Sequence, residues 1–109
     1  MVNAKIEKIA LDIKTMKIRG AGRIARAAVR AMQIAAKESK AKTPPEFSTE
    51  IEKVSRILIE TRPTAVSLPN AVRFVSMVLK QGHGADLETL KKNVSLRAEE
   101  FIKNSEEAV

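Results

Sequence analysis

Hydrophobic residues recur at intervals of three and four positions along almost the whole chain, a spacing typical of helices that bury one face. The first stripe predicts a helix from about Asn3 to Thr15, and the second predicts one from about Arg23 to Lys40. Three further helices are expected, from about Thr49 to Glu60, from Pro69 to Lys80, and from Asp86 to near the end. Because no segment alternates with period two, the pattern predicts an all-α fold, a compact bundle of about five helices.

Residues that start or stop helices lie between these stripes. Pro44 and Pro45 are expected to end the second helix, because proline lacks an N–H donor and restricts the residue before it. The segment Thr49-Glu50-Ile51-Glu52 is typical of a capping box and would begin the third helix, whereas Pro63 would end it. The last helix carries no Gly or Pro stop signal near Val109, so we expect a domain cut from a longer chain.

The second helix combines a small-residue face with a basic face. The expected buried face holds six residues, namely Ile24, Ala27, Ala28, Ala31, Ile34 and Ala35. Arg26, Arg30 and Lys37 share another face, and such a stripe is more often solvated than a ligand surface. Residues 1–40 carry ten Lys or Arg and three Asp or Glu, and residues 41–109 carry ten of each. The net charge of +7 therefore belongs to the first two helices, where it could attract phosphates or nucleic acid.

A basic turn, Lys17-Ile18-Arg19-Gly20-Ala21-Gly22-Arg23, joins these two helices. Gly20 and Gly22 permit backbone angles and close approaches that a Cβ atom would forbid. The first turn of the following helix offers unpaired N–H groups and partial positive charge, and the Arg19 fork matches a phosphate. These features make an anion cradle, although the residues alone fit an ordinary helix start better.

A second informative segment, Thr61 to Asn70, carries two prolines around one arginine. A rigid turn that holds Arg62 beside a core is suited to clamping a phosphate. The same residues also suit a tight helix–helix connection with Pro63 and Pro69 as punctuation. The residues themselves leave both interpretations open.

Composition excludes several other kinds of chemistry. The chain has no cysteine, and its one histidine, His83, has no metal-ligating neighbour, so it is expected to be an exposed loop residue. We expect no metal, no cofactor, no membrane span and no secretory signal, and hence a cytoplasmic protein. With three Phe and no Trp or Tyr, little is available for base stacking, so nucleic acid is not an expected partner.

The two motifs, Lys17 to Gly22 and Thr61 to Val72, together resemble the N-terminal helical domain of one superfamily. It contains methylthioribose-1-phosphate isomerase, archaeal ribose-1,5-bisphosphate isomerase, and the alpha, beta and delta subunits of translation initiation factor 2B. The archaeal ribose-1,5-bisphosphate enzymes fit best. The methylthioribose enzymes usually show Arg-Gly-Ala-Pro, and they carry a bulky aromatic where Asn70 stands here.

The resemblance covers the whole chain but only about the first third of such a protein. It implies that residues 1–109 form a helical substrate-phosphate-binding domain, followed in the parent by a Rossmann-like catalytic domain that this chain lacks. The implied reaction is an aldose–ketose isomerisation, ribose 1,5-bisphosphate to ribulose 1,5-bisphosphate, in nucleotide (AMP) salvage. By residue match, the substrate phosphate would contact Arg19, Gly20, Ala21, Gly22 and Arg62.

The resemblance also implies where the catalytic groups lie. A Cys and an Asp in the second domain transfer the proton, so no catalytic residue is expected in this chain, and the chain alone should be inactive. The parent is expected to form a homo-oligomer. The alternative is a protein-binding module like the regulatory subunits of initiation factor 2B. Arg19 and Arg62 favour the sugar phosphate, because a protein partner would not require both motifs.

Overall fold

The computed structural model describes residues 4–18, 20–62, 67–81 and 86–107 of the chain. Five helices account for most of these residues, and no strand occurs among them. The helices are α1 (Ala4–Lys14), α2 (Ala21–Glu38), α3 (Pro44–Thr61), α4 (Ser67–Gln81) and α5 (Leu87–Glu107). The all-α fold predicted from the hydrophobic spacing is therefore confirmed.

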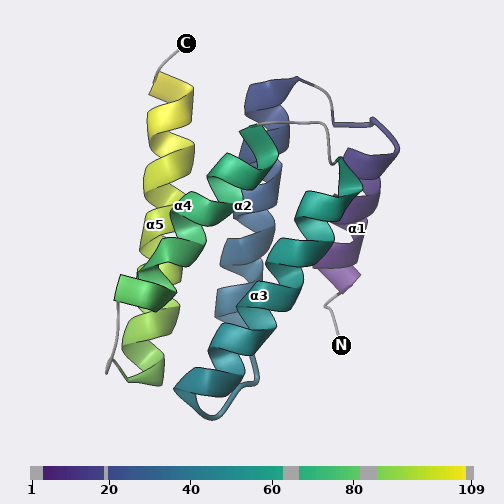
Figure 1. The fold of residues 1–109 in the computed structure, drawn as a ribbon. Coiled ribbons are helices and arrows are strands. Elements are labelled where there is room, and N and C mark those ends of the chain that lie inside the picture. Colours follow the sequence, from purple (N-terminus) through teal and green to yellow (C-terminus); the bar gives the residue numbers. More distant parts are fainter. Residues whose placement is uncertain (1–3, 19, 63–66, 82–85, 108–109) are drawn as a thin grey trace.

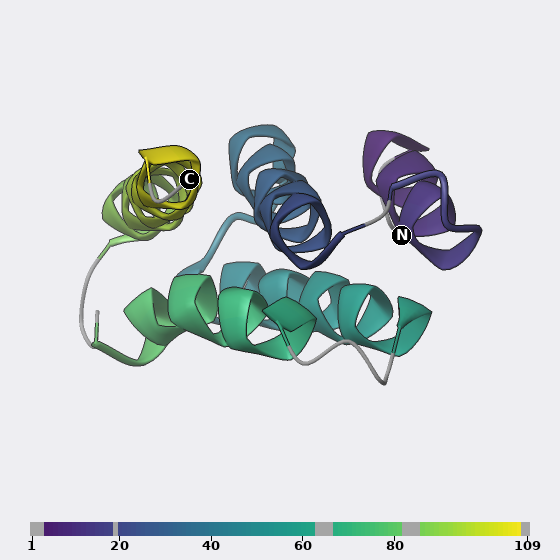
Figure 2. The ribbon, with the colours of Figure 1, turned by 90° about the horizontal axis from the view of Figure 1, so that it is seen from above.

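The helices pack in two layers. Figure 2 shows α1, α2 and α5 side by side in one layer, with α3 and α4 crossing beneath them. The molecule measures 37 × 30 × 20 Å, and its smallest dimension equals about two helix diameters. Within the first layer α2 lies between α1 and α5, and it contacts all four other helices. The fold is therefore organised around α2.

Helix α2 can occupy this central position because five of its nine described buried residues are alanine. Its buried residues are Ile24, Ala25, Ala28, Val29, Ala31, Met32, Gln33, Ala35 and Ala36. Alanine lets neighbouring helices approach closely, so α2 is covered on more of its circumference than a single stripe predicts. The sequence predicted one buried face; Ala27 and Ile34, assigned to it, are half-buried.

The start of α3 differs from the sequence prediction. The expected capping box at Thr49 is wrong, because α3 begins at Pro44, with Thr43 as its N-cap. The Thr43 hydroxyl accepts a hydrogen bond from the Glu46 N–H at 3.3 Å, and the Glu46 carboxylate accepts one from the backbone N–H of Lys42 at 3.0 Å. Proline is favoured in the first turn of a helix because the N–H groups there have no intrahelical acceptor.

The earlier start of α3 adds a residue to the core. Phe47 has no exposed surface and is the largest of the fully buried side chains. By contrast, the Thr49 hydroxyl lies inside the helix and donates to the backbone carbonyl of Pro45 at 3.0 Å. The prolines expected to end one helix therefore begin the next, and α2 ends before them, at Glu38.

The start of α5 agrees with the prediction. The Asp86 carboxylate accepts a hydrogen bond from the backbone N–H of Thr89 at 2.9 Å, as an N-cap residue does. Hydrogen bonds from the Thr89 side chain and backbone lower the pKa of Asp86. The apolar spacing of this segment predicts an inward face made of Leu87, Leu90, Val94, Ala98, Phe101 and Ile102. Leu90, Val94, Ala98 and Ile102 are buried and the other two are half-buried, so the predicted face is confirmed.

One buried polar side chain, Gln33, joins α2 to α5. Only 2 % of Gln33 is exposed. Its Nε2 donates to the Glu99 carboxylate at 2.7 Å and lies 3.4 Å from both the carbonyl and the hydroxyl oxygens of Ser95. Its Oε1 accepts from Nη1 of Arg30 at 3.4 Å. Because both ends of the amide are used, Gln33 specifies how the two helices lie against each other.

Removing this amide is expected to destabilise the bundle. Gln33→Ala should lower the free energy of unfolding by about 1–3 kcal/mol, because it leaves the partner groups on α5 without their buried donor and opens a small cavity. Urea denaturation followed by circular dichroism measures the change. Arg30→Ala, which removes an exposed partner on the same face, should cost less than Gln33→Ala. Equal losses of stability in the two variants would contradict the inference that the Gln33 amide fixes α2 against α5.

Candidate functional site

The two motifs singled out in the sequence lie at the same end of the bundle. Helices α2 and α4 begin at the upper end in Figure 1, and α3 ends there. Gly20 and Gly22 belong to the start of α2, and Arg62 directly follows the last residue of α3. Arg19 and Pro63–Val66 lie outside the described residues, as does His83. The fold therefore brings together the described parts of two segments about forty residues apart in sequence.

The start of α2 has the form of an anion-binding turn. Gly20 is the N-cap, with φ of 92° and ψ of 134°, a conformation that side chains other than glycine rarely adopt. The first helical hydrogen bond joins the Ile24 N–H to the Gly20 carbonyl at 3.0 Å. The N–H groups before Ile24 therefore have no intrahelical acceptor. Among the described residues no side chain makes a capping hydrogen bond at this end, and apart from the chain neighbours none has an atom within 4 Å of where a Gly20 Cβ would stand.

Helices that begin at the two ends of the bundle differ in whether their first turn contains an acidic residue. The first turns of α1, α3 and α5, which begin at the lower end in Figure 1, contain Glu7, Glu46 and Glu88 respectively. The first turns of α2 and α4, which begin at the upper end in Figure 1 and lie side by side in Figure 2, contain none. The two positive helix ends are thus uncompensated by carboxylates in their own first turns, which favours an anionic ligand there.

Arg62 adds a cation at this end. It is half-buried and follows α3, whose last turn contains no basic residue. Partial burial restricts the side chain, so less conformational entropy is lost when the guanidinium binds a ligand. A cation just beyond a helix C-terminus also interacts favourably with the helix dipole, so Arg62 has a structural use as well. Substrate kinetics and thermal melts of Arg62 variants separate the binding role from the structural role.

The basic face of α2 runs down from the same end. Arg30 and Lys37 are exposed, as expected for a solvated face, and so is Arg23, whereas Arg26 is half-buried. Among the described residues, ion pairs join Lys5 to Glu38 and Lys8 to Asp12. The excess charge of the N-terminal half is therefore displayed beside the candidate anion site.

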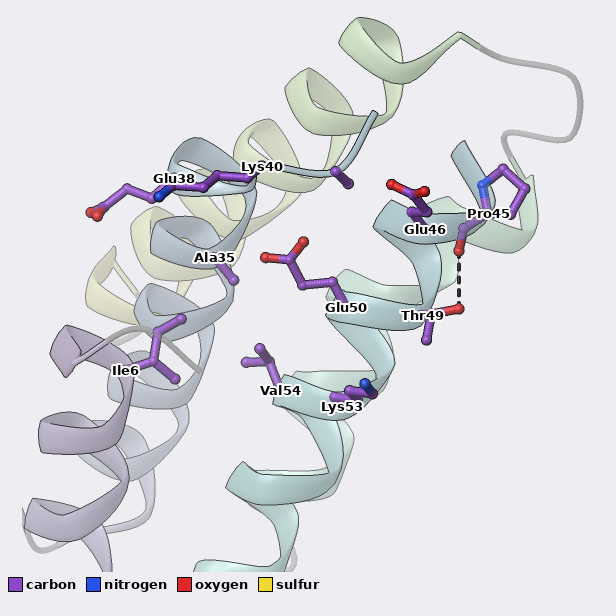
Figure 3. A pocket seen from close by; sticks show the side chains of 11 residues that line it. Ile6, Ala35, Glu38, Lys40, Pro45, Glu46, Thr49, Glu50, Lys53 and Val54 are labelled. Atoms are coloured by element: carbon purple, nitrogen blue, oxygen red, sulfur yellow. Dashed lines mark hydrogen bonds between the residues drawn. The ribbon is translucent and has the colours of Figure 1, made fainter. Parts of the chain in front are cut away.

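A cleft of about 770 Å³ lies at the opposite end, between the end of α2 and the beginning of α3, with α1 beside them (Figure 3). No motif in the sequence predicts this cleft. Its lining includes three carboxylates, Glu38, Glu46 and Glu50. They are engaged by the Lys5 ammonium, the Lys42 backbone N–H and the Ser39 hydroxyl respectively. The lining also includes Lys40 and Lys53, so the cleft carries charges of both signs.

Two other kinds of function gain no support from the described residues. Within residues 4–18, 20–62, 67–81 and 86–107, no three His, Cys, Asp or Glu side chains are grouped so as to hold a metal ion. No helix in that part of the chain has the length and apolar character needed to cross a membrane.

Comparisons with known proteins point to one family. The family model described as the initiation factor 2 subunit family matches residues 17–109. A ribose 1,5-bisphosphate isomerase of Pyrococcus furiosus is 50% identical over 111 residues, which cover all of this chain and 34% of that protein. The corresponding enzyme of Haloferax volcanii is 43% identical over 107 residues, covering 98% of this chain and 32% of that protein.

A solved structure shares the fold. The crystal structure of 5-methylthioribose 1-phosphate isomerase from Pyrococcus horikoshii superposes with a TM-score of 0.86 and 34% sequence identity, over 91% of this chain and 28% of that one. This chain thus spans about a third of the length of the curated relatives it matches. Because the family model matches most of the sequence, the chain belongs to the initiation factor 2 subunit family.

Proposed function

We propose that residues 1–109 form the phosphate-binding N-terminal helical domain of a sugar-phosphate aldose–ketose isomerase. The proposed reaction is the conversion of ribose 1,5-bisphosphate to ribulose 1,5-bisphosphate. Proteins named for isomerisation of this sugar are 43–50% identical to the chain, and this similarity supports the choice of substrate. The site residues proposed for the phosphate are Arg19, Gly20, Ala21, Gly22 and Arg62.

The observation that carries this proposal is the acid-free, uncapped start of α2 beside the start of α4, on the end where α3 delivers Arg62. Backbone N–H groups at a helix start bind one face of a phosphate, and a guanidinium binds its oxygens in pairs. This mode of recognition requires neither a metal ion nor a carboxylate group on the substrate. The site therefore suits a phosphorylated sugar better than it suits an uncharged ligand.

Phosphate binding contributes to catalysis by fixing the position of the reacting carbons. With a phosphate on the anomeric carbon, the sugar ring must open before hydrogen can move between neighbouring carbons. Binding energy from the phosphate holds the ring-opened sugar in place, and fixed hydrogen-bond donors stabilise charge that develops nearby. The groups that transfer the proton are proposed to come from a following domain, since this chain contains no cysteine.

This division of labour predicts that the chain alone is inactive. Incubated with ribose 1,5-bisphosphate, the 109 residues should give no ribulose 1,5-bisphosphate above the uncatalysed rate. The full-length protein that contains them should turn the sugar over, and mixing the chain with a separately produced second domain is the natural extension. Product formation is followed by chromatography of the sugar bisphosphates. Turnover by the chain alone would place a catalytic base within it and contradict the proposal.

A regulatory, protein-binding role is the alternative, and it is less well supported. It rests on the family description, whereas the relatives with the identities given above are named as isomerases. If the full-length protein binds no sugar phosphate and converts none, the regulatory alternative is favoured. Homo-oligomerisation of the full-length protein is likewise a proposal, and size-exclusion chromatography with light scattering tests it.

A further inference from the structure

One arginine of α2 differs from its neighbours in where its guanidinium lies. A Cβ atom at Gly22 would stand 3.3 Å from Nη1 of Arg26 and 3.9 Å from its Cζ. The Arg26 guanidinium therefore lies over the first turn of α2, one turn before its own Cα, as helix side chains lean toward the N-terminus. Because Gly22 has no side chain, the space over this turn is free for the guanidinium.

This position sets Arg26 apart from the two arginines beside it. Arg26 is half-buried, whereas Arg23 and Arg30 are exposed. Arg30 donates toward Gln33, away from the start of the helix. The structure thus places the Arg26 guanidinium against Gly22, in the turn whose N–H groups have no intrahelical acceptor, and the partial burial of Arg26 reduces the entropy lost on binding.

We propose that Arg26 is a further phosphate ligand of the candidate site, and that Gly22 keeps the space over the first turn open for it. This inference rests on the proposed function, because it adds a residue to the same site. A guanidinium beside helix N–H groups meets a phosphate with donors from two directions, and neither the turn nor a surface lysine supplies this geometry. The ligand class is a sugar phosphate bound through its phosphate group.

The kinetic test uses the full-length protein and ribose 1,5-bisphosphate. Arg26→Ala should lower kcat/KM roughly tenfold, mainly through KM, because a charge-assisted hydrogen bond to the substrate is lost. Arg26→Lys should restore only part of this loss, since a point charge lacks the planar fork. Arg30→Ala is the matched control, one turn further along the same face, and should stay within about twofold.

A direct binding test uses nitrogen-15-labelled chain and inorganic phosphate as the probe. Phosphate should shift the side-chain Nε resonance of Arg26 and the backbone amide resonances of Gly22 and Arg23, and it should leave the Nε resonance of Arg30 in place. Arg26→Ala should weaken the amide shifts without abolishing them, because the helix N–H groups remain. Equal shifts of Arg26 and Arg30 would indicate diffuse attraction to the basic face and overturn the proposal.

The outcomes separate this inference from the proposed function. If Arg62→Ala raises KM but Arg26→Ala does not, Arg26 is not a ligand and the proposed function stands. If neither variant changes KM and the full-length protein still isomerises the sugar, the phosphate is held elsewhere and both proposals fail. A lower melting temperature for Arg26→Ala with unchanged KM would make Arg26 structural, which also overturns the inference.

Discussion

Replacing Arg62 with alanine in the full-length protein should lower kcat/KM for ribose 1,5-bisphosphate by about ten- to a hundredfold. The physical reason is the loss of charge-assisted hydrogen bonds to phosphate, each worth about 1.5–3 kcal/mol. Arg19→Ala is expected to have an effect of the same order, because the proposed cradle uses both guanidinium groups. Steady-state kinetics with each variant, accompanied by a thermal melt, measures binding and folding separately.

The combined and conservative variants sharpen this test. If both arginines hold the same phosphate, the double variant should lose less than the product of the single losses, because removing one partner loosens the other. Arg62→Lys should recover only part of the activity, since lysine cannot donate in pairs from a rigid plane. The free energy of unfolding of each single variant should lie within about 1 kcal/mol of the parent value. Variants that melt much lower yet turn substrate over normally would identify these arginines as structural.

Replacing Phe47 with alanine should cause the largest loss of stability in the chain. The side chain is completely buried, and truncating a buried Phe costs about 3–5 kcal/mol from lost burial and the cavity left behind. A domain of this size has a total stability of about 5–15 kcal/mol, so the variant should melt more than about 10 °C lower. Calorimetry or circular dichroism of the 109-residue chain measures the shift.

Phe74→Ala is the matched control for this prediction. Phe74 is half-buried where α4 meets α5, with its ring centroid 5.8 Å from that of Phe101 and 4.7 Å from Cζ of Arg97. The same truncation removes less buried surface there, and the cation–π contact adds only about 0.5–1 kcal/mol. The loss should therefore be clearly smaller than at Phe47. A larger loss at Phe74 would mean that the α4–α5 contact, rather than the base of α3, dominates the core.

Local chemistry was sufficient to predict the elements of the fold. Apolar residues three and four positions apart defined five helices, and the inward residues of α5 were correct because an amphipathic helix has one energetically sensible face to bury. The Asp86 cap was also correct, since a capping side chain bonds within its own turn. By contrast, Thr49 and Thr43 both head a threonine-to-glutamate spacing of three, and the local signal that favours Thr43, proline in the first helical turn, was interpreted only as the end of the preceding helix.

The candidate site was predictable only in part. The residues of the two motifs could be named because glycine, arginine and proline have specific backbone and ligand chemistry. That Gly20 and Arg62 lie at the same end of the bundle depends on the direction in which each helix runs. The orientation of Arg26 over Gly22 depends on side-chain packing. The spacing of residues along the chain predicts neither this orientation nor the shared end of Gly20 and Arg62.

The sequence by itself determined that five helices form and which residue types could hold a phosphate, because both properties depend on neighbours within a few positions. The tertiary structure decided that α2 is the central helix and that Gln33 is buried against Glu99. It also decided that α2 and α4 begin together at an end with no acidic residue in either first turn. These features depend on contacts between residues far apart in the chain, and only the packing of all five helices fixes those contacts.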